Sequence, residues 1–360
     1  MKLKHFIQIT ACIVFSAASV LVLHSVSKEI THKANPFIRI FPPHPISQEY
    51  VLDIQYNSYY IAGVTGSHIY LGNTTAPLHL LQLTSDLSDS VHITLKIEDM
   101  KRYNFGQITL RVDSPFFYVM DGVMPGLFRG RIGEWVAQKF MFDSAYFVAA
   151  EPIGNASFAL KTTLSENQEH VLGKESVFEP KLFLSPGMLQ KQIDGVFCTD
   201  GLLRYNRALQ RVIYQYFYRN EFIVMDTNMN LLYRGHTIDT FSRAQISSAF
   251  IRHDSIQTLS SPPRVVNLES WTAEKYLFVS SNLMAKNEVA ELFNENSVID
   301  IYDLTDGHYV FSFYLHSQEK HKARSFSIVN QKLVGLYNTQ VAIYTLANVF
   351  SYLASFEGTN

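Results

Sequence analysis

The clearest strand–turn–strand pattern of this chain is VIDIYDLTDGHYVFSFYL, at residues 298–315. Alternating apolar and aromatic runs occupy both halves of the stretch, and Asp306-Gly307 stands between them. An Asp-Gly dipeptide between two such runs predicts a β-hairpin, because the tight turn requires positive φ and glycine adopts it without strain. The stretch therefore predicts two antiparallel strands with many aromatic side chains.

The same arrangement, an apolar run followed by a turn and a second apolar run, recurs along the chain. Six such pairs begin on average about 50 residues apart, which is a propeller-blade period. Blades packed around an axis cover the faces of aromatic-rich strands and leave only short free edges. The first runs are 59–63, 116–120, 146–150, 221–225, 276–280 and 332–336, and the second runs are 69–72, 127–130, 157–160, 231–234, 298–302 and 341–344.

The hairpin at 298–315 resembles the outer hairpin of exported TolB-like six-bladed β-propellers. The repeat pattern over about residues 50–346 is similar to that superfamily. The resemblance implies an all-β, six-bladed β-propeller and supplies no activity. Such a ring needs a closing strand, which we expect from residues 37–41 or 50–55. An irregular all-β fold or a pair of β-sandwiches is the alternative. Short helices are expected only at 243–251 and 285–293.

The N-terminus has the layout of an export signal. Lys2 and Lys4 precede residues 6–26, which carry no formally charged side chain and approach the length of a membrane-spanning helix. We expect residues 6–26 to be an uncleaved membrane anchor or a signal removed after the small residues near position 27. A buried N-terminal helix of a soluble protein is the remaining alternative. We therefore divide the chain into a signal peptide or anchor (1–27), a linker (28–49) and a propeller domain (50–360).

Composition narrows the class of protein further. The net charge of −2 argues against a nucleic-acid-binding protein, which needs a basic surface. Cys12 lies inside the apolar segment, so Cys198 is the single cysteine of the exported part and has no partner there for an intrachain disulfide. An exported domain without disulfides favours a bacterial periplasm, where the chain is anchored or released.

No sequence motif identifies a catalytic centre or a cofactor. Nucleophile-elbow, P-loop and zincin motifs are missing. His316 and His321 flank Glu319, but this run links two expected strands and is better explained as a charged loop than as a metal site. Residues 226–230 lack the glycine and glutamate of a calcium loop and fit an Asp/Asn turn. No metal ligand is therefore assigned.

Six residues are the candidates for ligand binding. Asp121 and Asp226 each follow the first run of a repeat, and Arg129 and Arg234 lie in the following runs. If these repeats superpose, each Asp and Arg would recur at one level of the ring, where Arg could bind a carboxylate. Tyr216 and Tyr218 alternate on one strand face and could stack on a sugar or a peptide. Turn formation and packing between blades are the structural alternatives.

We favour a non-enzymatic extracytoplasmic propeller that binds or scaffolds a protein or an envelope component. A hydrolase or lactonase with a metal on the ring axis is the alternative, and it predicts inward Asp, Glu, Asn or His from several blades. A quinoprotein-like oxidoreductase ranks third, because the chain has only two tryptophans and is short for eight blades. The fold itself does not decide among these activities.

Overall fold

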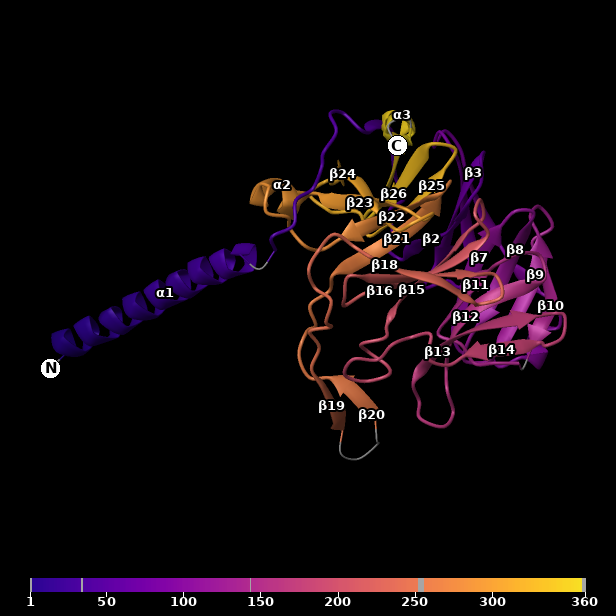
Figure 1. Cartoon of the computed structure of the whole chain (residues 1–360), viewed down its shortest axis with the longest axis horizontal. Coiled ribbons are helices and arrows are strands. Elements are labelled where there is room, and N and C mark those ends of the chain that lie inside the picture. The colour runs from indigo at the N-terminus through magenta and orange to yellow at the C-terminus, as the bar shows by residue number, and fades with distance from the viewer. Residues whose placement is uncertain (1, 34, 143, 252–255, 358–360) are drawn as a thin grey trace.

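The structure is a computed structural model that describes residues 2–33, 35–142, 144–251 and 256–357. Six antiparallel sheets of four strands each are arranged around a common axis (Figure 1). The six-bladed all-β propeller that the repeat pattern predicts is therefore confirmed. A short strand, β6 (Lys96–Ile97), adds to the outer edge of blade 2 in parallel.

The blades follow one another along the chain, each running from the axis outward. Blade 1 contains β2 (Tyr59–Val64), β3 (His68–Asn73), β4 (His79–Thr84) and β5 (Ser90–Thr94); blade 2 contains β7 (Ile108–Asp113), β8 (Phe116–Asp121), β9 (Gly126–Arg131) and β10 (Val136–Phe142); blade 3 contains β11 (Ala149–Pro152), β12 (Ser157–Thr163), β13 (His170–Ser176) and β14 (Leu182–Ser185). Blade 4 contains β15 (Gly201–Asn206), β16 (Arg211–Tyr216), β17 (Glu221–Asp226) and β18 (Leu231–His236); blade 5 contains β21 (Asn267–Ala273), β22 (Tyr276–Ser281), β23 (Ser297–Asp303) and β24 (Tyr309–Leu315).

Blade 6 joins the two ends of the propeller. Its strands β25 (Ser325–Val329), β26 (Lys332–Leu336) and β27 (Gln340–Thr345) come from the C-terminal part, and β1 (Ser47–Asp53) supplies the outermost strand. Val51 lies opposite Ala342 in the antiparallel register. Of the two expected closing segments, 50–55 is the one that overlaps the strand, in residues 50–53, and ring closure joins the N-terminal segment to the last blade.

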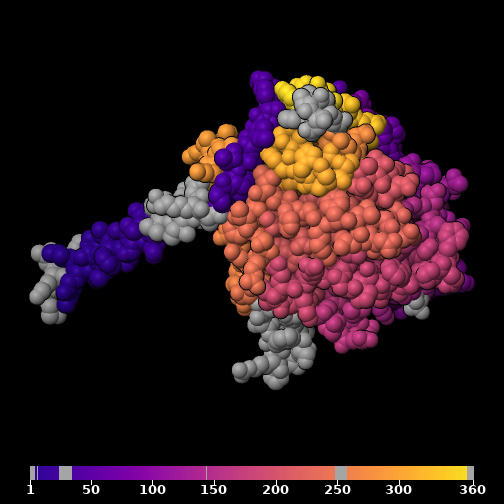
Figure 2. Space-filling model, viewed as in Figure 1, coloured from indigo at the N-terminus to yellow at the C-terminus, as the bar shows by residue number. Residues whose placement is uncertain are grey.

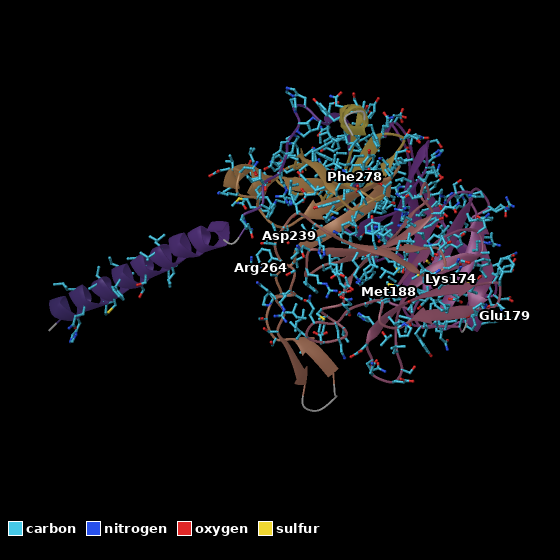
Figure 3. The ribbon with its side chains drawn as sticks, in the orientation of Figure 1. Lys174, Glu179, Met188, Asp239, Arg264 and Phe278 are labelled. Atoms are coloured by element: carbon cyan, nitrogen blue, oxygen red, sulfur yellow. The ribbon has the colours of Figure 1, made fainter. Side chains whose placement is uncertain are left out.

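The uneven spacing of the sequence repeats has a structural cause. The expected pairs begin on the first strand of blades 1 and 3, on the second strand of blades 2, 5 and 6, and on the third strand of blade 4. The longest interval between successive first strands separates β15 from β21, where the hairpin of β19 (Ser248–Ile251) and β20 (Ile256–Leu259) is inserted. Asp239 and Arg264 lie on the two segments that flank this hairpin (Figure 3).

Six hydrophobic cores hold the ring together, one between each pair of neighbouring blades. Leu277 and Phe278 illustrate the arrangement, because they are adjacent on β22 and their side chains point to opposite faces of the blade. Leu277 packs against blade 4, and Phe278 packs against blade 6. Both are fully buried. The aromatic-rich strands thus bury both faces, at roughly 1.5–3 kcal/mol for each large apolar side chain.

Three α-helices lie outside the sheets: α1 (Lys2–Lys33), α2 (Ala290–Glu295) and α3 (Ala347–Glu357). The helix expected at 285–293 is confirmed only in its last residues, where α2 begins. The helix expected at 243–251 is wrong, because residues 248–251 form β19 of the inserted hairpin.

Helix α1 projects away from the propeller (Figures 1 and 2). The large apolar side chains that the structure describes in it are exposed, among them Ile13, Phe15 and Leu23. In the part of the chain that the structure describes, no helix is long and apolar enough to cross a membrane. The span expected at residues 6–26 therefore stays a prediction.

Residues 35–46, which we call the strap, run from α1 along the outer edge of blade 5. The backbone amide of Ser312 on β24 donates to the carbonyl of Ile40, and Phe41 stacks on Tyr314 at 4.9 Å between ring centroids. The strap lies within the segment expected as a linker, and its contacts make it part of the folded body. It also covers a sheet edge that would otherwise expose unpaired backbone groups.

Arg39 fastens the strap to blade 5. Its guanidinium forms a fork with Asp300, with Nε–Oδ1 and Nη2–Oδ2 distances of 2.7 and 2.9 Å, and also donates to Glu288. All three side chains are almost completely buried. Burial alone would lower the pKa of Arg39, but the two carboxylates outweigh it and raise that pKa above its ordinary value. The Arg39 cation is therefore fully compensated inside the protein.

Candidate functional site

A polar cavity lies at one mouth of the propeller axis. A cavity of about 440 Å³, which we call the axial cavity, is lined where the first strands of all six blades end. Each blade contributes to its wall, with Val64, Arg111, Glu151, Tyr205, Trp271 and Ile328 as one residue from each of the six strands. Propeller geometry therefore brings residues that are far apart in the sequence to one small volume.

Arg111 and Trp271 form the centre of the axial cavity. Arg111 on β7 donates through Nη2 to Oε1 of Glu151 on β11 at 2.6 Å, and its guanidinium lies 5.5 Å from the Trp271 ring centroid. The Trp271 ring is held in turn, because its Nε1 donates to the carbonyl of Ile328 at 3.1 Å. Among the described residues, Nε and Nη1 of Arg111 have no hydrogen-bond partner. Arg111 therefore keeps donors available for a ligand.

Arg204 on β15 also lies against the Trp271 ring, and all of its guanidinium nitrogens have partners. Its guanidinium pairs with Glu269, lies 5.9 Å from the Trp271 centroid and donates from Nε to the carbonyl of Ser270 at 2.7 Å. Its Nη1 donates to the carbonyl of Leu203. Because these contacts use all three of its nitrogens, Arg204 positions the aromatic wall and Arg111 is the better group for direct recognition.

Asp113 and Arg207 form an ion pair at the rim of the cavity. Burial raises the pKa of Asp113. The Arg207 guanidinium lowers this pKa, and the negative charge of Glu151 raises it further. The Arg207 side chain is two-thirds exposed, at 66%, so it is accessible to a partner. At the rim, the accessible Arg207 cation therefore lies beside Asp113, whose carboxyl group is harder to ionise because it is buried.

The axial carboxylates do not form a metal centre in the described structure. Glu151 and Asp113 in the cavity lining are each paired with an arginine, as is Glu269 beside Arg204. Across residues 2–357, apart from the few positions that are not described, no group of three or more His, Cys, Asp or Glu side chains could hold a metal ion. Ion pairs beside an aromatic ring can hold a polar ligand of mixed charge.

Asp121 and Arg129 lie in blade 2 but not on its axial strand. The Asp121 carboxylate is fully buried and accepts backbone amides from the β7 approach and from its own turn, including Gly106 N at 2.6 Å. Arg129 donates to the carbonyl of Asn155 and covers the ring of Phe140 at 3.9 Å. Both residues therefore have structural partners within or between blades 2 and 3.

Asp226 and Arg234 occupy different positions in blade 4. Asp226 ends the third strand and accepts amides from the turn at Asn228 and Asn230, whereas Asp121 ends the second strand of its blade. Arg234 lies on the fourth strand and pairs with Glu221 at 2.7 Å. The two Asp–Arg sets are therefore not equivalent, and none of the four residues lies on an axial strand. Their role in ligand binding stays a prediction.

Tyr216 packs in the core between blades 3 and 4, with the Arg219 guanidinium 3.5 Å from its ring centroid. Tyr218 is half-buried in a small cluster around Cys198. Arg219 and Arg234 both contact Glu221, so the structure brings Tyr216 and Arg234 into one buried polar cluster. Asp121, Arg129 and Asp226 lie outside it.

The sequence contains a pattern that indicates the residues of the axial cavity, although they were not among the predicted site residues. On residues 107–114, QITLRVDS, the polar side chains of Thr109, Arg111 and Asp113 alternate with apolar ones. This strand comes first in its blade, and its last residues, Arg111, Val112 and Asp113, line the axial cavity. Polar and apolar side chains that alternate on the first strand of a blade indicate this site. The residues that follow the apolar runs, which the sequence analysis chose, do not.

No protein-family model and no curated protein matches this chain. Among solved structures it is similar to a DUF4221 family member from Bacteroides vulgatus (TM-score 0.53, 11% identity, 83% of this chain and 97% of that chain). A structural genomics protein of unknown function from Bacteroides thetaiotaomicron gives a TM-score of 0.50 at 9% identity, over 83% and 75% of the two chains. BamB from Moraxella catarrhalis gives 0.43 at 9% identity, over 83% and 97%.

At such low identities the likeness shows the β-propeller fold alone. The resemblance to TolB-like propellers is consistent with it and stays a resemblance.

Proposed function

We propose that this chain is a non-enzymatic, extracytoplasmic binding propeller whose axial cavity takes a carboxylate-bearing segment of a protein partner. The observation that carries the proposal is Arg111, which faces the cavity with donors to spare beside the Trp271 ring. A guanidinium fork matches a carboxylate, and an aromatic wall covers the apolar part of a peptide. The neighbouring carboxylates accept the N–H groups that a peptide also carries.

Export is part of the same proposal. Two lysines precede the apolar part of α1, whose side chains are exposed and whose axis leads away from the propeller (Figure 2). That arrangement supports a membrane anchor or signal at residues 6–26 and a propeller in the bacterial periplasm. A protease added to spheroplasts should degrade the propeller; complete protection until the cells are lysed would contradict export.

Fluorescence offers a direct test of binding. The chain has two tryptophans, so Trp135→Phe leaves Trp271 as the sole indole reporter. Acetylated tetrapeptides that carry a glutamate should change its emission on titration, and the same peptides with glutamine should bind more weakly. Arg111→Met should weaken glutamate-peptide binding about tenfold to hundredfold, because a charge-assisted hydrogen bond contributes about 1.5–3 kcal/mol.

Arg102→Met provides the matched control, because Arg102 is an exposed arginine paired with Asp99 on the periphery of blade 2. Its binding should equal that of the wild type. Equal binding of glutamate and glutamine peptides, or an unchanged affinity in Arg111→Met, would contradict the proposed site. Turnover of an ester or lactone that Glu151→Gln abolishes would instead favour the hydrolase alternative.

A further inference from the structure

We propose that His79 and His92, on the two outer strands of blade 1, form a binding site for a zinc ion. Leu81 on β4 lies opposite His92 on β5, so His79 is the diagonal neighbour of His92 on the same face of the sheet. Nε2 of His79 and Nδ1 of His92 are 3.2 Å apart. This site lies on the outer strands of its blade and is independent of the axial cavity.

The separation of the two nitrogens fits a shared metal. Zinc binds imidazole nitrogen at about 2.0–2.1 Å in tetrahedral geometry, which places two ligand nitrogens about 3.3–3.4 Å apart. The observed 3.2 Å between His79 and His92 needs little adjustment to reach that value. The exposed His92 ring stacks on His79, with 5.1 Å between the centroids and 24° between the planes, so it must turn to bring its lone pair onto the ion.

A third side chain lies at the same nitrogen. The hydroxyl of Tyr59, from β2, lies 3.2 Å from Nε2 of His79. A phenolic hydroxyl in this place can donate to a zinc-bound water. Histidine binds metal through the lone pair of its neutral imidazole.

The site has two imidazole ligands, and water completes the coordination on the solvent side. It is therefore consistent with the finding that the described residues contain no cluster of three His, Cys, Asp or Glu. The competing explanation is a hydrogen bond between the two rings without any metal. The experiment below separates the two, because only a zinc site changes the number of ions bound.

The test is a zinc titration of the purified full chain in detergent against a competing chromogenic chelator. Wild type should bind one zinc ion more than His92→Gln and His79→Gln. His68→Gln is the matched control, since His68 lies at the opposite end of the same blade, where its Nδ1 contacts Ser67. That variant should retain the wild-type stoichiometry.

Exposed His92 is the safer position to replace, and its variant should melt like the wild type in the absence of zinc. Added zinc should raise the melting temperature of wild type and His68→Gln but not that of His92→Gln, since the ion would bridge β4 and β5. Equal zinc stoichiometry and equal thermal response in wild type and His92→Gln would overturn the proposal.

Discussion

Replacement of Arg39 by alanine should destabilise the propeller more than any surface substitution in this chain. The change removes a fully buried guanidinium and leaves Asp300 and Glu288 as buried carboxylates without their main counter-ion. Removing one partner of a buried ion pair costs about 3–5 kcal/mol. The expected loss therefore lies near the upper end of single-substitution effects.

The melting temperature makes this magnitude measurable. At about 2.1 cal/mol/K per residue, a propeller of roughly 310 residues has an unfolding entropy of about 0.65 kcal/mol/K. A loss of about 3–5 kcal/mol then lowers the melting temperature by about 5–8 °C. Circular dichroism at a strand-sensitive wavelength follows the transition. Arg39→Lys keeps the charge but loses the fork to Asp300, so its melting temperature should fall between those of Arg39→Ala and wild type.

Arg102→Ala is the control, because Arg102 and Asp99 form an exposed pair with side chains 75% and 58% accessible. Exposed pairs contribute about 0–1 kcal/mol, so this variant should melt within about 1.5 °C of wild type. If Arg39→Ala melted as close to wild type as Arg102→Ala does, the strap would not be an energetic part of the propeller and this reasoning would be refuted.

Three further predictions concern the turns, the pH dependence and ring closure. Gly307 (φ +85°) and Gly133 (φ +96°) both have positive φ, but a Cβ at Gly307 would lie 2.9 Å from Tyr233 whereas one at Gly133 would meet nothing described within 4 Å. Gly133→Ala should therefore cost about 1–2 kcal/mol and Gly307→Ala more, as chemical denaturation would show. Burial and the nearby Lys161 charge lower the pKa of His170 below 6.5. Its stabilising contribution is therefore present above pH 6.5 and is lost as the pH falls through the folded-state pKa. In melting curves recorded at a series of pH values, His170→Gln should lose less stability on acidification than wild type. Deleting residues 47–53 removes the outer strand of blade 6 and should abolish the single cooperative transition seen by calorimetry, whereas retention of a wild-type transition would contradict closure by β1.

The hairpin at 298–315 shows how much local sequence can predict. Its two runs became β23 and β24, with Gly307 at positive φ in the turn, because the turn chemistry and the apolar alternation point to the same structure. A closing strand from the N-terminal segment was also predictable, since a ring of blades needs one, but the choice between residues 37–41 and 50–55 was not. Local pattern and ring topology together were enough for the fold.

Other features depended on contacts that no local pattern records. Residues 243–251 have helix-like spacing, yet pairing with β20 made residues 248–251 a strand, so a tertiary contact overrode local preference. The partners of Arg39 are about 250 and 260 residues away along the chain. Arg111 and Trp271 likewise meet only because their blades surround one axis. The candidate site therefore required the three-dimensional arrangement of blades.

Site-specific photo-cross-linking in intact cells tests the central claim, partner binding at the axial cavity, most directly. A benzoylphenylalanine residue at position 207 would lie at the mouth of the cavity. One at position 178 would lie in the turn between β13 and β14 of blade 3, where Phe178 is 69% exposed. We predict a protein adduct from position 207 that disappears in the Arg111→Met background, and none from position 178. An adduct from position 178 alone, or one at 207 that Arg111→Met leaves unchanged, would contradict the account.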